Sequence, residues 1–123
     1  MDAARLSNLR TRYMQDGQSI RLGGLASNLG RIASVAENPG NHQAVARMLE
    51  ESKFMIEWTA ADPLISIEEQ AVLVELQVGL ARWHYRWRRG FVDQATRASL
   101  ARHARAWAGR ILEMAGLLNE KRG

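Results

Sequence analysis

Histidine is the side chain in this sequence best suited to metal binding or acid–base chemistry, and it occurs three times, at positions 42, 84 and 103. Cysteine is absent, which excludes disulfides, thiol nucleophiles and cysteine-based zinc or iron–sulfur sites. In a helical hairpin that turns near Phe91, position 84 faces roughly position 98, and position 103 faces roughly position 79. His84 and His103 are then expected at different heights along the bundle. No Glu-x-x-His segment of the di-iron type occurs either. We therefore expect His42, His84 and His103 to be solvated or structural, with no metal ion and no cofactor.

A second pattern with catalytic precedent is Arg97-Ala98-Ser99-Leu100-Ala101-Arg102-His103. It resembles the Arg-x(4–6)-His pattern of helical ribonucleases of the HEPN class, in which an arginine stabilises phosphate charge and a histidine acts as acid or base. With 15 arginines and three histidines, roughly one such match arises by chance. Ala98 also stands where that class usually has a polar residue. A ribonuclease is therefore the remote alternative, and we expect no catalytic residues and no enzyme.

Basic and aromatic residues interleave in the segment Ala81-Arg82-Trp83-His84-Tyr85-Arg86-Trp87-Arg88-Arg89. Such a surface could stack bases and neutralise phosphates. The aromatic residues, however, keep the spacing of core-facing helical positions, and arginines in the last turns of a helix complement its dipole. The pattern favours a structural role. It leaves an acidic protein or a nucleic acid as the alternative partner, bound through Arg86, Arg88, Arg89 and Arg97.

The elements that position these residues are helices. Apolar residues recurring at steps of three and four predict helices over about 18–37, 41–59, 67–89 and 94–119. Pro39-Gly40, Asp62-Pro63 and Gly90 separate them, and these short links predict an antiparallel up-down four-helix bundle. Residues 1–16 form an N-terminal segment with apolar residues on one face, which predicts a short additional helix. The helix over 67–89 carries two apolar series. The first series is Leu73, Leu76, Leu80, Trp83 and Trp87, and the second is Val74, Val78, Ala81 and Tyr85. This helix is therefore expected to be the central element and to pack against more than one neighbour.

Size and composition point to a single domain over residues 1–123. The chain is 46% hydrophobic and 24% charged, with a formal net charge of +4, values typical of globular proteins. It contains no apolar run long enough for a membrane span and does not start like a signal peptide, so a cytoplasmic protein without membrane contact is expected. The predicted topology places Arg82, Arg86, Arg88, Arg89 and Arg97 at one pole of the bundle. It places Glu57, Asp62, Glu68, Glu69 and Glu120 at the other.

Surplus apolar surface favours self-association. Phe54 and Trp58 lie off the main apolar series of their helix, and four tryptophans are many for a chain of 123 residues. Large apolar patches that a core cannot hide usually mark interfaces. We therefore expect a non-enzymatic protein–protein interaction or regulatory protein that acts as a homodimer. Its predicted association surface consists of Phe54, Trp58, Tyr85 and Trp87.

One resemblance supports the helical prediction. The stretch Leu49-Glu50-Glu51-Ser52-Lys53-Phe54-Met55-Ile56-Glu57-Trp58-Thr59-Ala60, followed by Ala71 to Trp87 with Val74-Glu75-Leu76-Gln77, resembles a group of small uncharacterised proteins found mainly in cyanobacteria. The resemblance implies a cytosolic helical protein. It implies no activity, and no functional residues follow from it.

Overall fold

The computed structural model describes the backbone of residues 2–122 and the side chains of residues 2–116. The chain forms α1 (Ala3–Met14), α2 (Gln18–Val35), α3 (His42–Ala60), α4 (Ile67–Arg88) and α5 (Gln94–Arg122), with a 3-10 turn η1 (Pro39–Asn41) before α3. The all-α prediction is confirmed, since the described residues contain no strand. The predicted N-terminal helix is present as α1. The side chain of Glu120, predicted for the acidic pole, lies outside the described residues.

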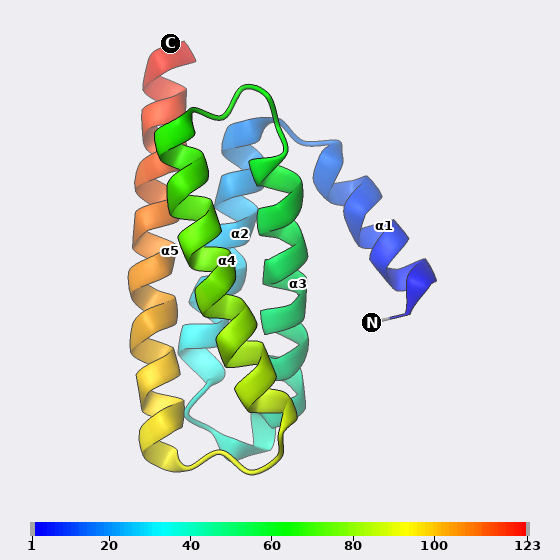
Figure 1. The fold of residues 1–123 in the computed structure, drawn as a ribbon, viewed down its shortest axis with the longest axis vertical. Helices are drawn as coiled ribbons and strands as arrows, with labels where there is room; N and C mark the ends of the chain where they lie inside the picture. Colours follow the sequence, from blue (N-terminus) through cyan, green and yellow to red (C-terminus); the bar gives the residue numbers. More distant parts are fainter. Residues whose placement is uncertain (1, 123) are drawn as a thin grey trace.

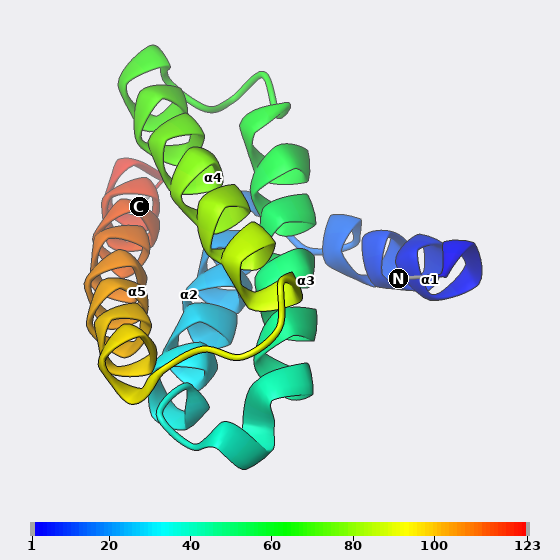
Figure 2. The same ribbon diagram turned by 60° about the horizontal axis from the view of Figure 1, so that its bottom comes forward.

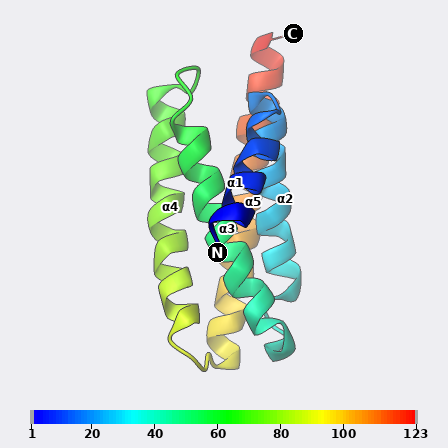
Figure 3. The ribbon, with the colours of Figure 1, turned by 90° about the vertical axis from the view of Figure 1, so that its right-hand side faces the viewer.

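Helices α2 to α5 lie side by side as a bundle (Figure 1), in which α2 and α4 run from top to bottom and α3 and α5 run the other way. Helix α2 packs against both α5 and α3, and α4 packs mainly against α3 (Figure 2). Helix α1 projects away from the bundle. Figure 3 shows α1 in front of α3, with α4 to one side and α2 to the other.

Local sequence sets the helix boundaries. The Ser66 hydroxyl accepts from the Glu69 backbone N–H at 3.1 Å, and the Glu69 carboxylate accepts from the Ser66 N–H at 3.4 Å, so α4 begins with a capping box. Asp93 accepts from the Thr96 N–H at 2.7 Å at the start of α5. Between these two helices Gly90 adopts φ 113°, a conformation that glycine reaches without strain.

The core is built from the predicted apolar series. Every helix of the bundle contributes fully buried residues, which include Leu22, Leu25, Leu29 and Ile32 of α2, Val45, Leu49 and Ile56 of α3, Leu73, Leu76 and Leu80 of α4, and Leu100, Ala104 and Ile111 of α5. These side chains recur at helical spacing, so each helix turns one apolar face inward. Burial of these faces is the main favourable contribution to folding.

The second apolar series of α4 is not buried, which corrects the prediction for this helix. Val74, Val78 and Tyr85 are 52%, 47% and 65% exposed, and Ala81 is also exposed. The reason is the position of α4, which packs mainly on α3 at the side of the bundle, so that within residues 2–122 no second helix lies over that face. Helix α2, which contacts both α3 and α5, is the central element instead.

Candidate functional site

Tyr13 attaches the end of α1 to the bundle. Its ring is buried, and its hydroxyl lies 2.5 Å from Thr59 Oγ1 and donates to the Arg21 carbonyl oxygen at 3.0 Å. The Tyr13 ring also lies 5.8 Å from the Trp58 ring. Nearer its start, α1 is held by an ion pair of 2.7 Å between Arg5 and Glu51. These contacts fix α1 against α3.

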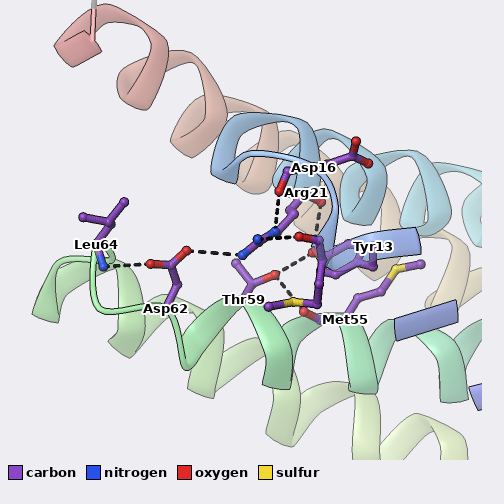
Figure 4. Close-up of polar contacts among 8 residues, drawn as sticks. Tyr13, Asp16, Arg21, Met55, Thr59, Asp62 and Leu64 are labelled. Carbon is purple, nitrogen blue, oxygen red and sulfur yellow. Dashed lines mark hydrogen bonds and ion pairs between the residues drawn. The ribbon is translucent and has the colours of Figure 1, made fainter. Parts of the chain in front are cut away.

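Arg21 reinforces this attachment from the start of α2 (Figure 4). Its Nε donates to the Asp16 carbonyl oxygen at 2.7 Å, and its Nη2 donates to the Met14 carbonyl oxygen at 3.0 Å. Its Nη1 contacts Asp62 Oδ2 at 3.3 Å, while Asp62 Oδ1 accepts from the Leu64 N–H at 2.9 Å. One guanidinium therefore joins the α1–α2 connection to the α3–α4 loop.

A groove remains between α1 and α3 beyond these contacts. Its volume is about 730 Å³, and its lining includes Leu6, Arg10 and Met14 of α1, Phe54, Glu57 and Trp58 of α3, and Pro63 of the following loop. Phe54 and Trp58 are half-buried and stacked, with ring centroids 5.9 Å apart. The structure thus brings together two of the four predicted association residues. The α1 wall was not predicted, although the apolar residues on one face of residues 1–16 indicate a helix there.

Charges of both signs border this groove. Arg10 stands on the α1 wall and Glu57 on the α3 wall, and both are exposed. Neither forms an ion pair with any side chain of residues 2–116. They are therefore available to a partner that enters the groove.

Trp87, also predicted for the association surface, is wrong as a surface residue because it is 1% exposed. Its ring stacks on the His42 ring at 5.5 Å and 12° and lies 5.3 Å from the Arg97 guanidinium carbon. Tyr85 is exposed, but it does not line the groove between α1 and α3. The four predicted association residues therefore lie in three places: the groove, the buried core and the exposed face of α4.

Arg97 is likewise wrong as a member of the predicted anion surface, since it is 3% exposed. Its Nε donates to the Val92 carbonyl oxygen at 3.1 Å, and its Nη2 lies 3.0 Å from His42 Nδ1. Because arginine only donates hydrogen bonds, His42 Nδ1 must be the acceptor, and His42 Nε2 carries the proton that it donates to the Trp87 carbonyl oxygen at 2.9 Å. Arg97 and neutral His42 thus join the starts of α5 and α3 to the end of α4.

The remaining predicted arginines are exposed. Arg86, Arg88 and Arg89 lie near the end of α4, as does Arg82 one turn earlier. The guanidinium carbon of Arg89 lies 5.4 Å from the centroid of the Tyr85 ring, and its Nη1 donates to the Tyr85 hydroxyl at 3.1 Å. This end of α4 therefore presents arginines next to an exposed aromatic ring.

The histidines occupy three different surroundings. The His103 ring is exposed and lies 5.6 Å from the ring of Trp83, the residue before His84, so the two histidines are closer in height than predicted. His103 contacts α4, whereas His84 contacts α3. His84 is buried against α3, where Nδ1 accepts from Lys53 Nζ at 3.0 Å and Nε2 lies 3.6 Å from Glu50. Burial, and then the charge of Lys53, lower the pKa of His84.

Neither a metal centre nor the ribonuclease arrangement assembles among these residues. No group of three potential metal ligands occurs among the described side chains. His103 contacts Ser99, Trp83 and Trp107, whereas the buried Arg97 side chain contacts Val92, His42 and Trp87. The two residues of the Arg-x-His pattern therefore share no contact.

Comparison of the chain with protein-family models, curated proteins and solved structures finds no match. Among the helices of residues 2–122, none is long and apolar enough to cross a lipid bilayer. What the protein does is therefore inferred from its own side chains.

Proposed function

We propose that this chain is a protein–protein interaction protein that acts as a homodimer, with the groove between α1 and α3 as its contact surface. The observation that carries the proposal is the stacked pair of Phe54 and Trp58, half-buried in a groove of about 730 Å³. Aromatic side chains in concave, partly desolvated positions are the groups that contribute most to protein interfaces. Covering them would bury apolar surface that the monomer leaves in water.

The apolar surface continues beyond the groove, as an interface requires. Phe54 and Glu57 also line a hollow of about 420 Å³ between α3 and α4, together with Val78 and Ala81. A stable interface buries about 800 Å² on each partner, more than one groove alone provides. Val78 and Ala81, both exposed on α4, supply this neighbouring area.

A second copy is the partner that the charges of the groove favour. In a two-fold dimer the same patch meets itself, so its charges must complement one another across the axis. Arg10 and Glu57 stand on opposite walls of the groove, and neither has an ion-pair partner among the described side chains. Arg10 of one copy would then face Glu57 of the other, twice in each dimer.

Light scattering and sedimentation test the dimer directly. We expect a mass of twice the chain's 13.8 kDa at micromolar concentration. Phe54→Ala should weaken association about 10- to 100-fold, as truncation of a central aromatic residue does. Phe91→Ala is the matched control, because this ring is 87% exposed and does not line the groove. A mass of one chain for the unmodified protein would contradict the proposal.

Charge exchange tests the contact between copies. Arg10→Glu and Glu57→Arg should each weaken the dimer, because each places two like-charged pairs across the axis. A mixture of the two variants should associate, since both contacts are then between opposite charges. Arg12→Glu, an equal change at another exposed position of α1, should leave association intact. If the mixture associates no better than either variant alone, Arg10 and Glu57 do not meet across the interface.

A further inference from the structure

The outer face of α4 carries a regular pattern of arginine and tyrosine. Arg82, Tyr85, Arg86 and Arg89 follow one another at steps of three, one and three, so they lie on one side of the helix, and all four are exposed. We call these four residues the α4 stripe. Phe91, 87% exposed, follows just beyond the end of the helix. The exposed Tyr85 and Phe91 rings belong to no apolar core and are available to a ligand.

The arginines of the α4 stripe lack carboxylate partners. None of them forms an ion pair within residues 2–116. Hydrogen bonds with Thr96 and, to a lesser extent, the charge of Arg86 lower the pKa of Asp93. Asp93 is already engaged in capping α5. The positive charge of the stripe is therefore not neutralised by the fold.

Basic surface also extends from α4 towards α3. Arg88 lies next to the stripe and lines a hollow of about 220 Å³ together with Arg5 and Arg47. Glu50 and His84 line the same hollow, so it is not purely basic. Arg88 can nevertheless add a fourth cationic contact at the end of α4.

We propose that the α4 stripe binds single-stranded nucleic acid, with Arg82, Arg86 and Arg89 contacting phosphates and Tyr85 stacking on a base. Arginine supplies forked donors for phosphate oxygens, and an exposed aromatic ring offers a face to any unpaired base. Arg89 lies over the Tyr85 ring and donates to its hydroxyl at 3.1 Å, which holds the ring in position. A duplex hides its base faces, so it would use the charges but not the ring. These four residues line neither the groove between α1 and α3 nor the neighbouring hollow with Val78 and Ala81, so the site does not depend on the proposed dimer.

Fluorescence anisotropy with a labelled oligothymidylate of about 12 nucleotides tests the site, since this length covers a short stacking surface. Single-stranded binding weakens with a slope of about −0.7 per phosphate contact in a plot of log affinity against log salt. The three arginines of the stripe together with Arg88 then give a slope of about −3, or about 50-fold weaker binding between about 50 and 200 mM salt. Arg86→Gln with Arg89→Gln should halve the slope and leave about a 7-fold change.

The aromatic contact has its own readout. Tyr85→Ala should weaken binding about 5- to 150-fold, the effect of losing one stacked base, without changing the salt slope. Tyr85→Phe should keep most of the affinity, because the ring does the stacking and Arg89 still lies over it. Arg12→Gln with Arg31→Gln is the matched control: it removes two exposed arginines from α1 and α2, and the salt slope should not change. All of these positions are exposed, and circular dichroism would check that the variants remain folded.

Four outcomes would overturn the inference. The first is no binding of the single strand at low salt. The second is an equal loss of affinity in the Arg12 and Arg31 control, which would indicate a response to net charge alone. The third is tighter binding of the corresponding duplex. The fourth is binding of anionic lipid vesicles or polyglutamate with the same affinity as the single strand and no effect of Tyr85→Ala.

Discussion

Raising the pH above 10 should loosen the attachment of α1 to the bundle through a single group, the Tyr13 phenol. Burial raises the pKa of Tyr13 from 10.0 to about 12, and it outweighs the hydrogen bond with Thr59 and the charge of Arg21, which act in the opposite direction. The folded protein therefore favours the neutral phenol, whereas the unfolded chain ionises at the ordinary pKa. Folding consequently becomes less favourable at pH values at which Tyr13 is ionised in the unfolded chain but neutral in the folded protein.

The size of the effect follows from the shift. Because the folded pKa lies above the unfolded one, the stabilisation is complete below pH 10 and is lost as the pH rises towards 12. One pKa unit corresponds to about 1.4 kcal/mol, so the full loss is about 2.7 kcal/mol, and half of it, about 1.4 kcal/mol, has occurred by about pH 11.

Denaturant unfolding of the unmodified protein and of Tyr13→Phe at about pH 8 and about pH 11 measures this loss. At the lower pH the variant should be less stable by about 1 kcal/mol, because its ring cannot form the hydroxyl contacts with Thr59 and the Arg21 carbonyl. At the higher pH the advantage of the unmodified protein should fall by about 1.4 kcal/mol and disappear. Other titrating groups are the same in both chains. A difference in stability that stays constant between the two pH values would refute the reasoning.

Three further predictions concern α4. Burial and the charge of Lys53 lower the pKa of His84 below 6.5, so stability should fall as the pH drops below 6.5, and His84→Gln should flatten this dependence in unfolding titrations. A Cβ at Gly79 would lie 2.9 Å from Trp107 Cζ2, so Gly79→Ala should destabilise the fold by about 1–3 kcal/mol in denaturant unfolding, and Trp107→Phe should partly relieve the clash. Ser66→Ala removes the hydroxyl of the capping box and should cost about 1 kcal/mol, measured by thermal unfolding.

The helices could be predicted closely because their signals are local. Helical periodicity, the Ser66 capping box and the breaks at Pro39 and Gly90 depend only on residues near one another in the chain, and the observed helix ends lie within three residues of the predicted ones. The neighbours of each helix are not local. The second apolar series of α4 has the spacing of a buried face, yet Val78 is exposed because none of the described helices covers that side. Periodicity identifies the apolar face of a helix but not the element that covers it.

The candidate site residues also divide into those that local sequence predicts and those that depend on distant parts of the chain. Phe54 and Trp58 come together because they are one helical turn apart on α3, which the sequence shows directly. The burial of Arg97 could not be predicted, because its acceptors are the Val92 carbonyl oxygen and the His42 ring, the latter 55 positions away in the chain. The helix dipole makes a cation near the start of a helix mildly unfavourable, and this favours exposure of the Arg97 side chain to solvent. Specific hydrogen bonds and the Trp87 ring outweigh that preference.

The attachment of α1 and the proposed interface depend on different kinds of side chain, so they can be separated by experiment. Polar contacts of Tyr13, Arg5 and Arg21 hold α1 in place, while the apolar wall formed by Phe54 and Trp58 is left partly uncovered. Because the polar contacts lie within one chain, their loss lowers the free energy of unfolding at any protein concentration. Because Phe54 would be covered only by a partner, its loss should act on association and vary with concentration. A groove whose walls are fixed by polar contacts at its end can therefore stay open in the monomer and still be ready for a partner.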